Sequence, residues 1–148
     1  MPSSPSESAP APLRWRLHAQ LFAATVASVF LTGLDAGDKW WSRSLSSISL
    51  SHGLLFAGSL LAILVAHEGG HYVAARIHKV EASLPYFIPM PFLSPFGTMG
   101  AVIRMSGTIR TRAALLDIGA SGPLAGLVLA IPLYVWGTAH PQPSSHWK

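Results

Sequence analysis

The sequence contains no cysteine, which excludes disulfide bonds, thiolate metal sites and cysteine nucleophiles. Charged residues are also scarce, at 11% of the 148 residues, against roughly 25% in soluble domains. Hydrophobic residues make up 50% of the chain, and its mean hydropathy is +0.41. Length and composition therefore predict a single membrane-embedded domain.

The positive charge is small and dispersed. The formal net charge is +4, and no stripe of lysine and arginine is interleaved with aromatic residues, so we expect no nucleic-acid partner. The basic residues lie at the ends of apolar segments instead, with Arg14 and Arg16 before the first and Arg76 and Lys79 at the end of the second. Basic residues favour the cytoplasmic side of a membrane. This pattern therefore predicts a multi-pass protein of the lipid bilayer, with its N-terminus in the cytoplasm.

Three apolar segments predict an all-α membrane protein with about three transmembrane helices. They cover residues 17–34, 53–77 and 113–136, and each is about long enough to cross a bilayer core of ~30 Å. We expect a disordered N-terminal tail at residues 1–13, because these are mostly Pro, Ser and Ala. Residues 14–140 would form the membrane-embedded core, and residues 141–148 a polar C-terminal tail.

The segment between the second and third predicted helices, residues 81–112, is apolar but rich in proline and glycine. Prolines remove backbone donors, so the segment cannot form one continuous helix. Non-helical backbone at membrane depth requires protein or a water-filled cavity beside it. We therefore predict a re-entrant or interfacial loop, followed by a short β-hairpin that turns at Ser106 and Gly107.

The second apolar segment contains the sequence HEGGH. His67 and His71 are four residues apart, so both lie on one face of a helix and can bind one zinc ion. Glu68 is placed to serve as the general base of an HExxH metalloprotease. Gly69 and Gly70 would let a neighbouring element approach closely. The competing interpretation, incidental polar residues on a packed helix, is disfavoured because an ionisable group there costs roughly 2.5–3.5 kcal/mol on membrane insertion.

A catalytic zinc site requires a third protein ligand. The metzincin pattern fails, because Ala74 and Ile77 occupy the positions that would need Gly and His. His78 lies about 10 Å further along the helix axis and is better interpreted as an interfacial histidine. Glu81 could reach back only from a loop. Asp117 is a weak candidate, and its alternative role is that of a first-turn acid that suits the helix dipole.

Three pieces in order resemble the site-2 protease family of intramembrane zinc metalloproteases. They are HEGGH in an apolar helix, then PYFIPMPFLSPFGTMGAVIRM, then DIGASGPLAGLVLAIP. The resemblance covers roughly residues 53–132 and is strongest to the branch with a GTFGAVI-like loop. It implies a Zn2+ cofactor held by His67 and His71, Glu68 as general base, and cleavage of a transmembrane or membrane-adjacent segment of a membrane-protein substrate. It also implies that residues of one strand present the substrate: Gly97, Thr98, Gly100, Ala101 and Val102.

The family's third ligand is an aspartate in an LDG motif of a further helix, and no LDG occurs in this chain. The resemblance therefore implies that further C-terminal helices or a partner chain complete the site, as for a fragment, a truncated product or half of a split enzyme. The alternative function is a non-catalytic, membrane-embedded binding module. A small zinc transporter is disfavoured, because residues 53–66 offer only Ser59 as a polar group along the path.

Overall fold

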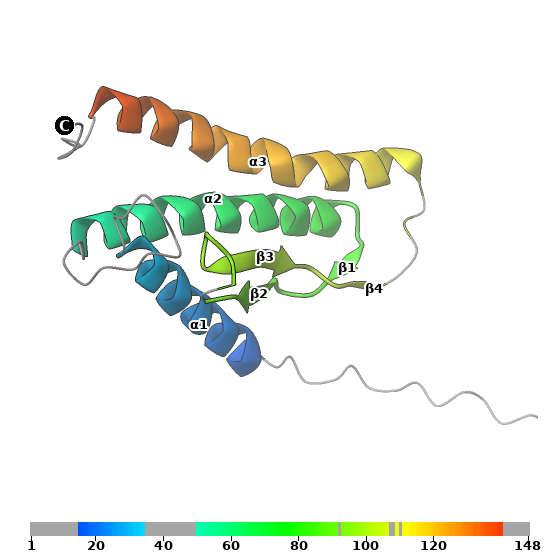
Figure 1. Ribbon diagram of the computed structural model, residues 1–148. Coiled ribbons are helices and arrows are strands. Elements are labelled where there is room, and N and C mark those ends of the chain that lie inside the picture. The colour runs from blue at the N-terminus through cyan, green and yellow to red at the C-terminus, as the bar shows by residue number, and fades with distance from the viewer. Residues whose placement is uncertain (1–14, 35–49, 92, 107–108, 110, 141–148) are drawn as a thin grey trace, which may run out of the picture.

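A computed structural model describes residues 15–34, 50–91, 93–106, 109 and 111–140. Three helices, α1 (Trp15–Gly33), α2 (Leu50–Ile77) and α3 (Arg112–Ala139), form most of this part. Short strands fill the connection between α2 and α3 (Figure 1). The predicted helices are thus found with ends shifted by no more than three residues. The two predicted tails lie outside the described residues.

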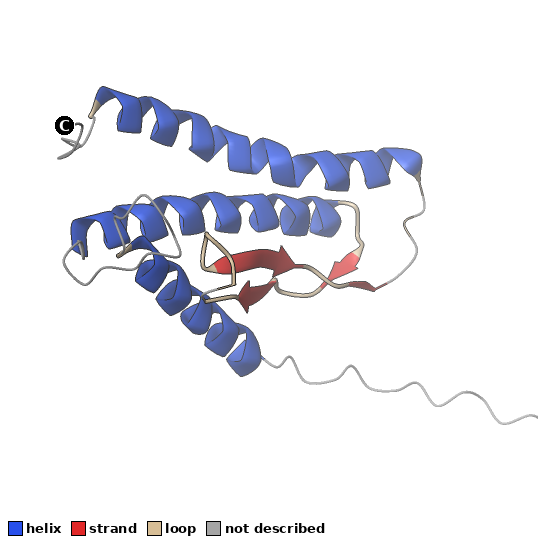
Figure 2. Cartoon of the chain, viewed as in Figure 1, coloured by secondary structure: helices blue, strands red, loops and turns tan. Residues whose placement is uncertain are grey.

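The long helices α2 and α3 pack side by side and run in opposite directions. Gly70 faces Ser121, while His67, one turn earlier in α2, faces Gly126, which lies later in α3. Figure 2 shows the strands and α1 on the side of α2 that faces away from α3. A small apolar core closes the end where α2 stops and α3 starts; it consists of Ala74, Ala75, Val80 and Ile118.

Four strands form two antiparallel pairs, and their connectivity differs from the predicted hairpin. Strand β2 (Tyr86–Pro89) pairs with β3 (Thr98–Val102), with a register shift between Ile88 and Pro89. Strand β1 (Glu81–Ala82) pairs with β4 (Met105–Ser106). The predicted turn at Ser106 and Gly107 therefore does not join β3 to its partner, and Gly107 itself lies outside the described residues. The pairing of β3 with the earlier strand reflects a tertiary contact that local alternation cannot reveal.

Two helices, α2 and α3, are long and apolar enough to cross a membrane. Many of their large apolar side chains lie on the outside, including Ile77, Leu116 and Tyr134, each more than two-thirds exposed. Such a surface suits lipid rather than water. Helix α1 is not one of these two candidate spans, so a third membrane crossing stays a prediction.

Candidate metal and peptide site

The two histidines of HEGGH face each other on α2. The Nε2 atoms of His67 and His71 are 3.2 Å apart, and the rings meet edge to face. Glu68, between them in sequence, is buried with 7% of its surface exposed. The helical spacing predicted in the sequence thus brings two imidazole nitrogens to one point beside a buried carboxyl group.

Helix α3 holds the His71 ring from the other side. Nδ1 of His71 lies 2.6 Å from the carbonyl oxygen of Ile118, so the ring N–H donates to that oxygen when Nδ1 is protonated. This tautomer leaves the Nε2 lone pair free to face His67. Hydrogen bonds of this kind fix the tautomer and ring orientation of metal-binding histidines.

Glycine in the contact between α2 and α3 permits the close approach. A Cβ atom built on Gly122 would overlap the His71 ring, and one built on Gly70 would overlap the carbonyl group of Ser121. The expectation of close approach is therefore met at Gly70. At Gly69 a Cβ would meet nothing within 4 Å.

The pair of histidines fits a tetrahedral zinc ion. Two nitrogens that each bind zinc at 2.0–2.1 Å lie about 3.3 Å apart in that geometry. The observed separation of 3.2 Å agrees with this value. Within the described residues, however, no group of three or more His, Cys, Asp or Glu side chains could hold a metal ion.

A cavity of about 420 Å³ joins the histidines to strand β3. Its walls include His67, Glu68 and His71 from α2, and Gly119 from α3. Because Pro123 has no N–H, the Gly119 carbonyl lacks its usual intrahelical donor. The cavity is therefore lined by titratable groups and by a glycine whose carbonyl lacks its usual intrahelical donor.

The residues of the predicted substrate strand separate into two groups. Ala101 and Val102 line the cavity with the histidines and Glu68. Thr98 is buried, and its hydroxyl donates to the carbonyl of Ile88 at 2.9 Å. Gly97 packs against α1. Gly100 belongs to β3 but is not among the residues that line the cavity.

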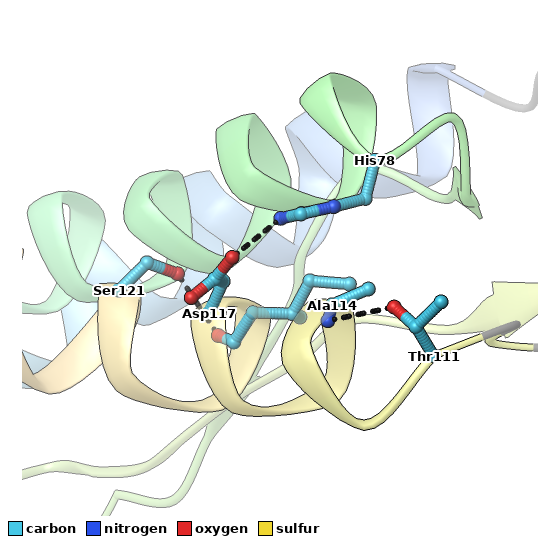
Figure 3. A network of polar contacts seen from close by, with 6 residues as sticks. His78, Thr111, Ala114, Asp117 and Ser121 are labelled. Carbon is cyan, nitrogen blue, oxygen red and sulfur yellow. Dashed lines mark hydrogen bonds and ion pairs between the residues drawn. The ribbon is translucent and has the colours of Figure 1, made fainter.

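Asp117 does not join the two histidines. Its Oδ2 atom lies 2.9 Å from Nε2 of His78, just beyond the end of α2 (Figure 3). The expectation of a first-turn acid is also wrong, because α3 begins at Arg112 and its first turn contains no acid. Thr111 caps that end by accepting a hydrogen bond from the backbone N–H of Ala114. His78, expected to be an interfacial residue, also links the end of α2 to α3 through this contact.

Sequence reasoning missed the contribution of the Ile118 carbonyl. A backbone acceptor carries no side-chain signal, so its role could not be assigned before the packing of α3 was known. The small residues of SGPLAG gave the only hint, because they predict a close helix contact somewhere along α3.

Comparison with known proteins agrees with the resemblance noted in the sequence. The sequence model of peptidase family M50 matches residues 55–143. The probable zinc metalloprotease EGY1 of Arabidopsis thaliana, described as chloroplastic, is 38% identical over 84 residues, which cover 57% of this chain and 15% of that protein. The probable zinc metalloprotease EGY2 of Oryza sativa subsp. indica is 36% identical over 88 residues, 60% of this chain and 16% of that protein.

The matched region is thus a small part of each relative: the chain spans about 15% of the length of the curated relatives that it matches. No solved structure matches the chain.

Proposed function

The chain belongs to peptidase family M50, and from this premise we propose that it forms part of a zinc-dependent endopeptidase that cleaves membrane proteins within the bilayer. The observation that carries the proposal is the pair of imidazole nitrogens 3.2 Å apart, beside a buried glutamate and in a cavity that reaches β3. The relatives named as probable zinc metalloproteases support the same reaction and the same metal.

His67 and His71 would hold the zinc ion through their Nε2 atoms. When bound, zinc supplies a Lewis acid that activates water and polarises a peptide carbonyl. The hydrogen bond from His71 Nδ1 to Ile118 keeps the ring turned toward the metal position. Glu68 would accept a proton from water on its carboxylate and donate it to the leaving amine. Its place on the cavity wall lets it reach a peptide held there.

Strand β3 would present the substrate in an extended form. A transmembrane helix hides its peptide bonds in intrahelical hydrogen bonds, so a segment must unwind before it can be cleaved. An extended segment can add to a strand edge by main-chain bonds. Ala101 and Val102 support this role, because they line the cavity of the catalytic groups. The same strand contains Thr98 and Gly100, for which we propose a role in shaping it.

The basic residues at one end of the molecule support an orientation. Arg76 and Lys79 lie at the end of α2, and Arg112 begins α3 at the same end of the pair (Figure 1). We infer that this end faces the cytoplasm. The zinc site, about two turns from the end of α2, would then lie near the cytoplasmic side of the bilayer.

A third zinc ligand is required for catalysis. In the described part of the chain Asp117 pairs with His78, so the donor would come from another segment or from a partner chain. The alternative function is a membrane-embedded binding module that lacks catalysis. It is favoured by one observation, the lack of a three-residue metal cluster within the described residues.

The zinc site is tested by metal analysis of the detergent-purified chain. We expect stoichiometric zinc in the parent chain and its loss in the His67→Ala, His71→Ala double variant. His140→Ala is the matched control, because in the part of the chain that the structure describes this imidazole hydrogen-bonds to its own helix, at Trp136. Zinc that is equal in all three proteins would contradict the proposed site.

Catalysis is tested with Glu68→Gln, which keeps the shape of the side chain. The probe is a single-span test peptide with central glycines, reconstituted with the chain in liposomes. We expect Glu68→Gln to retain zinc and to lose cleavage by about 100-fold or more, because it removes the general base. Zinc binding without cleavage by the parent chain would favour the binding module.

A further inference from the structure

Helix α1 lies before the region that matches the peptidase family, yet it contacts the strands at several points. The family match begins at residue 55, whereas α1 covers Trp15–Gly33. The rings of Phe22 and Phe87 meet edge to face with centroids 4.9 Å apart. The His18 ring lies 4.1 Å from that of Tyr86. Strand β2 is therefore packed on α1 through its aromatic side chains.

A buried polar link joins α1 to Gly97, the residue just before β3. The Ser28 hydroxyl donates to the carbonyl oxygen of Gly97 at 2.5 Å, and only 4% of Ser28 is exposed. The same carbonyl accepts the backbone N–H of Met90 at 3.1 Å. One oxygen thus ties together the two ends of the β2–β3 connection and the helix beside it.

Gly97 fits this contact because it has no side chain. Its φ is +74°, in the left-handed region that other residues rarely adopt. A Cβ atom there would also overlap the α1 backbone at Ser28 and Val29. The backbone conformation of Gly97 and its packing both indicate that this residue lies directly against α1.

We propose that Ser28 is a positioning residue, which fixes β3 on α1 and so sets where the strand lies relative to His67 and Glu68. Gly97 directly precedes β3, and Ala101 and Val102 lie at the end of that strand, at the cavity wall. A strand free to shift at Gly97 would present a peptide to Glu68 at more than one register. This inference rests on the proposed function for its consequence in cleavage, but not for the placement of the strand.

The placement is tested by spin-label distances, for which the lack of native cysteine is convenient. Labels at Met99→Cys on β3 and Val73→Cys on α2 occupy exposed positions, with 66% and 55% of each parent side chain accessible. We expect Ser28→Ala to shift and broaden the distance distribution. Thr25→Val is the matched control: Thr25 is equally buried on α1, but its hydroxyl donates to Leu21 within the helix.

Gly97→Ala disrupts the same contact from the other partner. It should shift the distance distribution in the same direction as Ser28→Ala. A distribution that stays unchanged in Ser28→Ala and in Gly97→Ala would overturn the proposal. So would an equal shift in Thr25→Val, since the effect would then come from general loosening of α1. None of these outcomes depends on zinc or on proteolysis, so they are separate from a failure of the proposed function.

The consequence for substrate register is tested by cleavage of the single-span test peptide. Loss of one buried hydrogen bond should raise KM about fivefold. Products from neighbouring peptide bonds should accompany this change, while zinc content stays at the parental level. A single cleavage position with an unchanged KM in Ser28→Ala would overturn the role of Ser28 in register.

Discussion

At the scale of single residues, the candidate site depends on groups that carry no charge. His71 receives its orientation from a backbone carbonyl at Ile118, and the space for its ring comes from the missing side chain of Gly122. Both residues belong to α3, whereas the histidines and Glu68 belong to α2. The chemistry of HEGGH is therefore supported by a helix that contains none of the motif.

Gly122→Ala tests this support. The added methyl group would overlap the His71 ring, so we expect the ring to be displaced and zinc content to fall. Overpacking of this kind typically destabilises by about 1–3 kcal/mol. The measurement is zinc content together with thermal unfolding in detergent.

Gly119→Ala is the matched control, because a Cβ there would meet nothing within 4 Å. This variant should keep its zinc and be as stable as the parent, or more stable, since alanine favours helix by about 1 kcal/mol over glycine. Equal zinc in the two variants would contradict the tight contact at Gly122.

At the scale of elements, α3 contacts the α2 side of the pair through a different kind of interaction at each point along its length. Near its start Asp117 pairs with His78, then Ile118 and Gly122 contact His71, and further along Gly126 faces His67. The antiparallel register of two helices thus decides which α3 residues reach the histidines. In the same register Asp117 pairs with His78 and not with the two histidines of HEGGH.

Asp117→Asn tests whether Asp117 is separate from the zinc site. The His78–Asp117 pair is partly exposed, with 29% and 58% of the two side chains accessible. Exposed pairs contribute about 0–1 kcal/mol, so we expect a small loss of stability and unchanged zinc content. Zinc analysis beside His78→Gln, which removes the other partner, provides the comparison. Zinc lost in Asp117→Asn and retained in His78→Gln would show that Asp117 is a ligand after all.

At the scale of the whole molecule, the exposed apolar surface of α2 and α3 predicts that both helices are embedded in lipid. Their antiparallel packing places Lys79 and Thr138 at opposite ends of the pair. The two strand pairs and α1 lie along one side of α2, away from α3 (Figure 1). The cavity is lined by residues of α2, β3, β4 and α3.

Single-cysteine labelling tests this arrangement. Lys79→Cys and Thr138→Cys, made separately in the cysteine-free chain, should react with a membrane-impermeant maleimide from opposite sides of sealed vesicles. If the N-terminus is cytoplasmic and α1 also crosses the membrane, Lys79→Cys reacts from the cytoplasmic face. Labelling of both positions after detergent is added is the control for accessibility. Reaction of both from one face of intact vesicles would exclude the membrane-spanning arrangement of α2 and α3.

The sequence alone determined the three helices, the helical face shared by His67 and His71, and the family of the chain. These features depend on local hydrophobic runs and on spacing within one helix, which need no knowledge of distant contacts. It could not assign the partner of Asp117, the strand that pairs with β3, or the support of His71 by Ile118. Each of these joins residues far apart in the chain, so it is decided by the register in which α3 packs on α2 and by the seating of β2 and β3 on α1.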